Sequence, residues 1–108
     1  MKPNVKTYLG FAKKKNSLLI GYESVFRARQ KVYLVLIQQD LAENAKKKVT
    51  EYCETKKIPL FTADEPLEAT VYIPNCKAIG ITDKSLSEVI IKNLTDESGA
   101  EVKLDLHI

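Results

Sequence analysis

The sequence is short of the residues that metal centres and histidine-based catalysis require. Among its 108 residues are two cysteines and one histidine. Cys53 and Cys76 are far apart and form no CxxC motif, and His107 stands near the carboxyl terminus. A His/Cys metal site would therefore lack ligands, so we expect neither a metal nor another cofactor. Two buried, reduced thiols in a cytoplasmic protein are the simpler interpretation of the cysteines.

Long apolar runs and glycine-rich loops are missing as well. The longest uninterrupted apolar run covers residues 32–37, far fewer than a membrane helix needs. No charged stretch followed by an apolar segment opens the chain, so we expect neither a secretory signal nor a membrane partner. The chain also has no glycine-rich phosphate loop and no nucleophile beside a visible base. An enzyme acting on a small-molecule substrate is therefore the least favoured class.

The chain does have enough apolar residues for one folded domain, and its charge is unevenly distributed. A hydrophobic content of 44% is ordinary for a globular domain spanning residues 1–108. Residues 1–63 hold 13 Lys and Arg but 5 Asp and Glu, a net charge of +8, whereas residues 64–108 hold 4 and 9, a net charge of −5. This asymmetry predicts a polyanionic partner on the amino-terminal side, although a lysine run such as 46–48 more often keeps a helix face solvated than binds RNA.

The apolar pattern from Leu18 to Lys57 predicts a strand, a helix, a second strand and a second helix. The run at 32–37 is typical of a strand buried on both faces. Two strands joined by a helix form a βαβ unit, which would place the amino end of the first helix at the carboxyl edge of the sheet, the usual binding edge. The predicted elements are a strand at 18–20, a helix from Gly21 to about Gln30, a strand at 32–37, and a helix that a capping box at 40–43 opens and that ends near Lys57.

The flanking segments complete an α/β pattern. An apolar stripe of Val5, Tyr8, Leu9 and Ala12 predicts a helix that begins at Pro3 and stops at Asn16. The other predicted elements are a strand at 58–61, a helical turn near Pro66, an apolar loop at 71–75, a strand at 76–81, a helix opened by a capping box at 85–88, a turn at 96–99 and an edge strand at 102–108.

The helix that Gly21 opens is the candidate binding element. Free backbone N–H groups at a helix amino end attract phosphate or base acceptors. Glu23 can accept hydrogen bonds from base edges, Ser24 supplies a hydroxyl, and Arg27 can reach a phosphate or a guanine from the same face. The same composition is also typical of an amphipathic helix with a charged outer face.

The order of elements is distinctive when it is combined with five stretches of sequence, which are residues 8–13, 19–22, 32–37, Asp40 and 57–60. In these features the chain resembles the kink-turn-binding ribosomal proteins of archaea and eukaryotes, and above all their small stand-alone bacterial relatives of the YlxQ type. The resemblance implies a three-layer α-β-α sandwich with a four-stranded mixed sheet, to which residues 96–108 would add an edge strand. It also implies binding of a sharply bent RNA internal loop with sheared G·A pairs.

The resemblance transfers to individual positions. The family site begins with glycine, any residue, asparagine and glutamate, with a lysine three residues further on. Gly21 matches the glycine, Glu23 and Ser24 stand at the asparagine and glutamate positions, and Arg27 stands at the lysine. The family's second element is an apolar loop before the fourth strand. The candidate RNA-binding residues are therefore Gly21, Tyr22, Glu23, Ser24, Arg27, Lys31, Asp40, Ile73, Pro74 and Asn75.

These observations favour a protein that binds structured RNA, associated with the ribosome or with translation in the cytoplasm. Its expected partners are ribosomal or other structured RNA, together with ribosomal or translation proteins. The alternative is a protein-interaction module on the same scaffold that has lost RNA recognition. The acidic carboxyl-terminal half and the alternating tail favour this alternative, because an exposed edge strand can pair with a strand of a partner.

Overall fold

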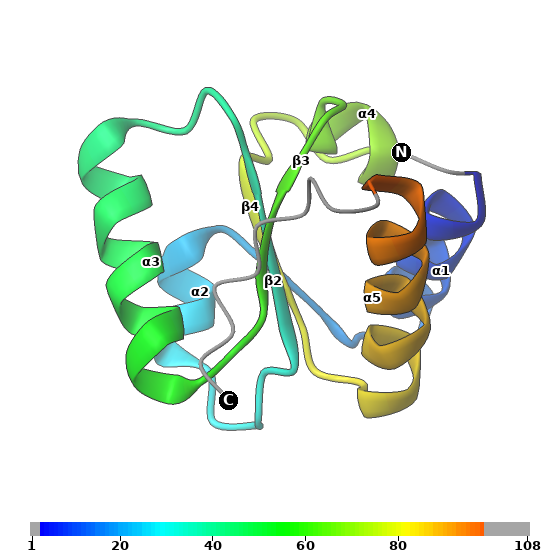
Figure 1. Cartoon of the computed structure of the whole chain (residues 1–108), viewed down its shortest axis with the longest axis horizontal. Helices are drawn as coiled ribbons and strands as arrows, with labels where there is room; N and C mark the ends of the chain where they lie inside the picture. Colours follow the sequence, from blue (N-terminus) through cyan, green and yellow to red (C-terminus); the bar gives the residue numbers. More distant parts are fainter. Residues whose placement is uncertain (1–2, 99–108) are drawn as a thin grey trace.

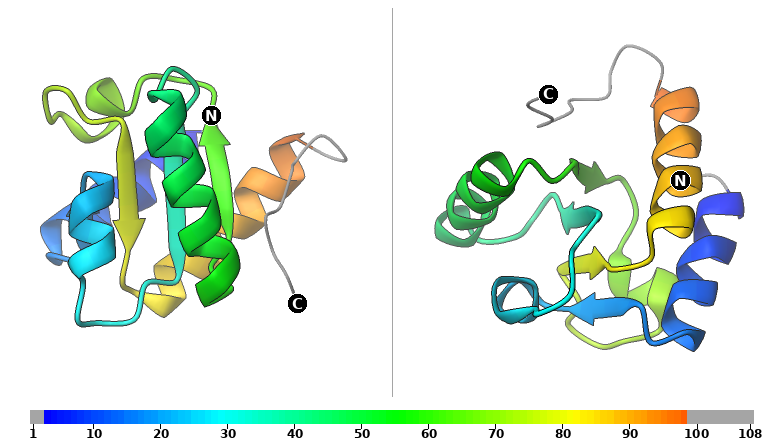
Figure 2. Two further views of the ribbon diagram at one scale, coloured as in Figure 1. Left: turned by 90° about the vertical axis from the view of Figure 1, so that its left-hand side faces the viewer. Right: turned by 90° about the horizontal axis from the view of Figure 1, so that it is seen from below.

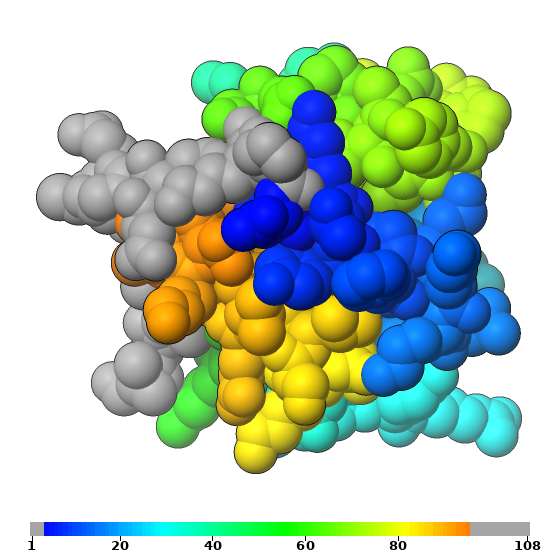
Figure 3. All heavy atoms as spheres, turned by 90° about the vertical axis from the view of Figure 1, so that its right-hand side faces the viewer, coloured from blue at the N-terminus to red at the C-terminus, as the bar shows by residue number. Residues whose placement is uncertain are grey.

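The computed structural model describes residues 3–98, which form helical layers on both faces of a mixed sheet (Figure 1). Helices α2 and α3 cover one face, and α1 and α5 cover the other, with α4 against α1 (Figures 2 and 3). The predicted three-layer α-β-α sandwich is therefore confirmed. In chain order the elements are α1 (Pro3–Lys14), β1 (Leu18–Ile20), α2 (Tyr22–Arg27), β2 (Leu34–Gln38), α3 (Glu43–Lys56), β3 (Leu60–Ala63), α4 (Leu67–Val71), β4 (Ala78–Ile81) and α5 (Lys84–Ser98).

The strand order is β1-β4-β2-β3, so the two strands of the predicted βαβ unit, β1 and β2, are not neighbours in the sheet. Strand β4 pairs antiparallel with both β1 and β2, whereas β2 and β3 pair in parallel. Strands β1 and β2 thus run in the same direction but are separated by β4. The parallel neighbours are β2 and β3, which α3 connects. Hydrogen bonding to β4 decides this arrangement, and the local order of elements does not reveal it.

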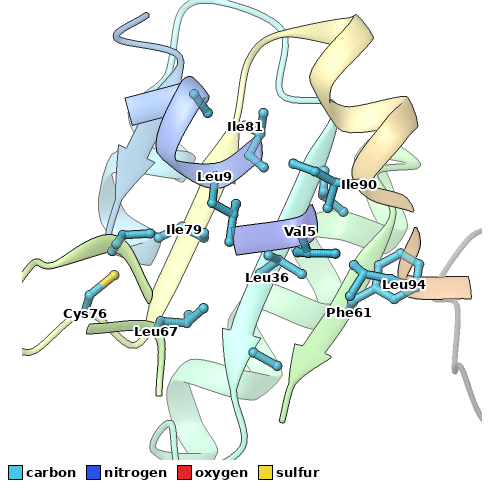
Figure 4. Close-up of a cluster of buried hydrophobic side chains, with 14 residues drawn as sticks. Val5, Leu9, Leu36, Phe61, Leu67, Cys76, Ile79, Ile81, Ile90 and Leu94 are labelled. Carbon is cyan, nitrogen blue, oxygen red and sulfur yellow. The ribbon is translucent and has the colours of Figure 1, made fainter. Parts of the chain in front are cut away.

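The core is divided by the sheet into two apolar clusters. Strand β2 contributes to both, because Leu34 and Leu36 face the α1–α5 side, whereas Val35 and Ile37 face the α2–α3 side. This confirms the prediction that the apolar run at 32–37 is buried on both faces. The labelled side chains of Val5, Leu9, Leu36, Ile79 and Ile90 converge in the first cluster (Figure 4). Burying each such side chain stabilises the fold by about 1.5–3 kcal/mol relative to exposure.

Both predicted capping boxes are wrong, because each helix begins elsewhere. Helix α3 begins at Glu43 after Ala42, and no side chain caps it; Asp40 instead pairs with Lys77, with 2.6 Å between Oδ2 and Nζ. Helix α5 is capped by Asp83, whose Oδ1 accepts a 2.8 Å hydrogen bond from the backbone N–H of Leu86. The cap of α5 thus has the ordinary spacing of three residues but begins two residues before the predicted box, whereas the Asp40 carboxylate caps no helix.

Several predicted boundaries also change. Helix α2 ends at Arg27 and not near Gln30, because Ala28 is extended and the chain crosses there to the amino end of β2. The sheet pairing limits strands β2, β3 and β4 to 34–38, 60–63 and 78–81. Helix α5 continues through Ser98, so the turn predicted from residue 96 is wrong over 96–98. Gly99 and the predicted edge strand at 102–108 lie outside the described residues.

Candidate nucleic-acid interface

Three connections meet where β1, β2 and β3 end and β4 begins. The backbone N–H of Gly21 donates to the carbonyl of Ala78 over 2.8 Å, and the N–H of Gln38 donates to the carbonyl of Lys77 over 2.8 Å. The β1–α2 junction and the β2–α3 connection therefore flank the segment that leads into β4. We call this surface, formed by residues 20–24, 38–42 and 72–77, the loop end; it lies toward the top of Figure 1.

Gly21 sets the direction in which α2 leaves the sheet. Its φ of 85° and ψ of 148° suit glycine, while a Cβ there would meet no atom within 4 Å. The requirement at this position is therefore conformational and not a matter of space. The helix that follows presents Glu23 and Ser24 to solvent and buries Val25 against the sheet.

Glu23 and Arg27 form an ion pair along the outside of α2. Arg27 Nη2 lies 3.6 Å from Glu23 Oε1, and the two side chains are 77% and 69% exposed. Such an exposed pair contributes little to stability, about 0.3–0.5 kcal/mol for this helical spacing. Either side chain can therefore leave the ion pair and bind an external partner at a small cost in free energy.

Tyr22 differs from its neighbours because it is half-buried. Its ring lies 5.6 Å from that of Phe26, which in turn lies 4.8 Å from the ring of Tyr52 in α3. The hydroxyl of Tyr52 donates to the carbonyl of Val25 over 3.3 Å. Tyr22 thus belongs to the contact between α2 and α3, and it positions the exposed side chains of α2.

The connection from α4 to β4 contains two residues with positive φ, Tyr72 at 59° and Asn75 at 60°. Glu68 shapes this loop, because its Oε2 accepts the backbone N–H of Asn75 over 2.7 Å and its carbonyl accepts that of Ile73 over 3.2 Å. Ile73 packs on the core, while Pro74 and Asn75 are exposed. A left-handed conformation costs a non-glycine residue roughly 1–2 kcal/mol, so the surrounding contacts must enforce this loop.

Two further residues belong to the loop end although the sequence did not single them out. The side chain of Tyr72 is 83% exposed beside Ile73, where the apolar character of the segment was the only sequence signal. Lys77 pairs with Asp40 across the surface, and its hydrogen bond holds the pKa of Asp40 below the ordinary value. Only the sheet pairing brings Lys77 and Asp40 together.

Lys31 does not join the other candidate residues. It follows α2 and precedes β2, and the backbone N–H of nearby Tyr33 donates to the carbonyl of Ile81, the last residue of β4. Lys31 therefore lies at the end of the sheet opposite to the loop end. The structure gathers Gly21, Tyr22, Glu23, Ser24, Arg27, Asp40, Ile73, Pro74 and Asn75 on or beside the loop end, and places Lys31 apart from them.

The described residues contain neither a cluster of metal ligands nor a membrane-spanning helix. Within residues 3–98, no three His, Cys, Asp or Glu side chains gather closely enough to hold a metal ion. Cys53 and Cys76 are buried and form no disulfide, as predicted, and burial raises the pKa of the Cys76 thiol. No helix in this part of the chain is both long and apolar enough to cross a bilayer.

The fold and the loop end define an α/β sandwich with a mixed-charge surface at the carboxyl ends of β1–β3. A model of the ribosomal protein L7Ae/L30e/S12e/Gadd45 family matches residues 3–91, so the chain belongs to that family. A solved structure of a protein of unknown function from Bacillus halodurans is similar, with a TM-score of 0.77 and 26% sequence identity, covering 84% of this chain and 96% of that one. The search of curated proteins finds no match. Family membership supports RNA binding and ribosome association in general.

Proposed function

We propose that the protein binds structured RNA through the loop end and docks onto a kink-turn or a related bent internal loop. Its family supports RNA as the partner. The observation that carries the choice of site is the meeting of three connections around the start of β4, with exposed side chains on each. A sharply bent RNA presents phosphates, open base edges and extruded bases on one side, and proteins read such RNA mainly by shape. The complex would act at the ribosome or elsewhere in cytoplasmic translation.

Helix α2 would supply the polar contacts. Arg27 would leave Glu23 to bind a phosphate, which costs little because their ion pair is exposed. The carboxylate of Glu23 and the hydroxyl of Ser24 would accept hydrogen bonds from guanine edges, for which the carboxylate is the stronger acceptor.

The α4–β4 loop would supply the apolar contacts. Ile73 is anchored on the core, and Pro74 offers no backbone N–H that binding would leave unsatisfied. The exposed ring of Tyr72 lies next to them in sequence. An extruded base would stack against this apolar surface, and base–aromatic stacking contributes about 1–3 kcal/mol.

Reversing the charge of Arg27 tests the site. Arg27→Glu should weaken binding to a kink-turn hairpin at least tenfold, a loss of about 1.4 kcal/mol, because it replaces a phosphate contact by repulsion. Fluorescence titration measures the affinity, and thermal unfolding checks that the domain stays folded. Lys48→Glu is the matched control, since Lys48 is an exposed cation on α3 away from the loop end. Equal losses in the two variants would mean that only overall charge matters, and unchanged binding in Arg27→Glu would refute the site.

Recovery of cross-linked RNA from cells tests the class of partner. We expect wild-type protein to retain structured RNA and Arg27→Glu to lose it. A co-purifying protein without RNA would instead support the protein-interaction module on the same scaffold.

A further inference from the structure

The surface is hollowed at the end of the sheet opposite to the loop end. The hollow has a volume of about 770 Å³ and is lined by residues 28–33, Tyr52 and residues 56–59. It lies between the connection from α2 to β2 and the carboxyl end of α3, toward the bottom of Figure 1. A volume of this order accommodates a small ligand or one or two nucleotides, and not the width of a duplex. We call it the basic hollow.

Four positively charged side chains, which come from two separate segments of the chain, line the basic hollow. Arg29 and Lys31 come from the α2–β2 connection, and Lys56 and Lys57 come from the end of α3; all four are exposed. The lining contains no carboxylate among the described residues. Complementing the helix dipole of α3 accounts for Lys56 and Lys57. It does not account for Arg29 and Lys31, which a second segment brings to the same place.

Two tyrosine rings lie beneath these cations. Lys31 Nζ is 5.3 Å from the centre of the Tyr33 ring, and Lys56 Nζ is 6.0 Å from that of Tyr52. Tyr52 is held in place by its contact with Phe26 and by its hydrogen bond to the Val25 carbonyl. Aromatic rings flanked by cations are the combination with which proteins bind single-stranded nucleic acid, because bases stack on the rings and the cations hold the phosphates.

We propose that the basic hollow binds a single-stranded extension of the RNA that docks at the loop end. This rests on the proposed function. Arg29, Lys31 and Lys56 hold its phosphates, and a base stacks on Tyr33 or Tyr52. Helix α2 joins the two surfaces over about 9 Å, and exposed Arg27, its last residue, directly precedes the residues that line the hollow. An extension of about four nucleotides, within the range that one binding surface of this kind covers, bridges them.

The test compares a kink-turn hairpin with the same hairpin carrying a four-uridine extension. Wild-type protein should bind the extended hairpin at least tenfold more tightly. Arg29→Glu/Lys31→Glu should abolish that gain while changing affinity for the plain hairpin less than about threefold. The matched control, Lys47→Glu/Lys48→Glu, makes the same change in net charge on exposed residues of α3 outside the hollow, and it should keep the gain. Urea unfolding checks that both variants remain folded.

Each result separates this proposal from the proposed function. Failure of wild-type protein to bind the plain hairpin would refute the loop-end site. Tight binding of the plain hairpin with no gain from the extension, or an equal loss of the gain in both double variants, would refute the basic hollow alone. A 4-thiouridine extension should cross-link to Tyr33, Tyr52 or their neighbours, and cross-links confined to other segments would refute it. If uridine monophosphate bound as tightly as the extension, the ligand of the basic hollow would be a free nucleotide and not an RNA strand, and the proposal would be refuted.

Discussion

The two ends of the sheet carry charge in opposite ways. At the loop end, positive and negative side chains are paired, as in Arg27 with Glu23 and Lys77 with Asp40. In the basic hollow, the described lining has cations and no carboxylate. Paired charges with free acceptors suit selective hydrogen bonding to base edges, whereas cations alone attract phosphate whatever the sequence. Under the two proposals, the loop end would select the RNA and the basic hollow would strengthen the complex.

The largest effect should come from a change that disturbs both ends together. Gly80 lies in β4 under α2, and a Cβ there would come within 2.8 Å of Val25 Cγ2. Gly80→Ala should push α2 away from the sheet and lower the free energy of unfolding by about 1–3 kcal/mol. Because α2 carries Glu23 and Ser24 of the loop end and leads directly into residues 28–33 of the basic hollow, plain and extended hairpins should each bind at least tenfold more weakly, or about 1.4 kcal/mol. Urea unfolding and fluorescence titration measure the two effects.

Gly10 provides the control for that change. A Cβ at Gly10, inside α1, would meet no atom within 4 Å. Gly10→Ala should raise the free energy of unfolding by about 0.5–1 kcal/mol and leave RNA binding unchanged, since alanine favours the helix. A Gly80→Ala variant as stable and as active as Gly10→Ala would show that α2 adjusts without cost.

A smaller effect should distinguish selection from simple attraction at the loop end. Glu23→Ala removes a negative charge and frees Arg27, so attraction alone would tighten the complex. We expect the opposite, a loss of about fivefold or roughly 1 kcal/mol, because a base loses its acceptor. The loss should shrink for a hairpin whose sheared G·A pairs are replaced by Watson–Crick pairs. Tighter binding to both hairpins would show that Glu23 serves only to hold Arg27.

The smallest effect should appear in the pH dependence of the free energy of unfolding. One aspartate at each end of the sheet contributes to it, Asp40 at the loop end and Asp83 at the opposite end. The hydrogen bond from Lys77 lowers the pKa of Asp40, and that from the Leu86 backbone, followed by that from Lys15, lowers the pKa of Asp83. The unfolded chain then binds more protons than the folded one. The added stability is present above the ordinary aspartate pKa of about 4 and is lost as pH falls through the lowered values.

Urea midpoints near pH 6 and near pH 3 should therefore differ less in Asp83→Asn than in the wild type. Asp40→Asn should reduce the difference less, because the Asp40 side chain is 62% exposed and that of Asp83 only 15%. Equal pH dependence in the wild type and both variants would mean that neither interaction stabilises the fold.

Burial was largely predictable from the sequence, as were the starts of α1 at Pro3 and of α2 after Gly21, while the starts of α3 and α5 were not. The stripe of Val5, Leu9 and Ala12 is fully buried, because helical spacing directly determines which residues share a face. The box that was predicted to begin at Asp40 is wrong because α3 begins only at Glu43, and the Asp40 carboxylate pairs instead with Lys77, which is far away in the chain. A capping motif indicates where a helix can begin, but its carboxylate can form an ion pair with a distant residue instead of capping the helix.

The candidate site was predictable wherever one short segment forms it. Gly21, Glu23, Ser24 and Arg27 lie within one strand-to-helix junction, so local spacing was enough to place them together. Tyr72 and Lys77 escaped notice because their neighbours at the loop end come from other segments. Lys31 was grouped with α2 because a longer helix was predicted. Since α2 ends at Arg27, Lys31 lies in the connection to β2 and lines the basic hollow.

The sequence by itself determined which segments are buried, where Gly21 breaks the chain, and that positive charge gathers in the first half. Only the tertiary structure decided that β4 inserts between β1 and β2, which brings residues 72–77 between Gly21 and Asp40. The physical reason is that apolar spacing follows from local geometry, whereas strand order follows from hydrogen bonding and packing between segments that are remote in the chain.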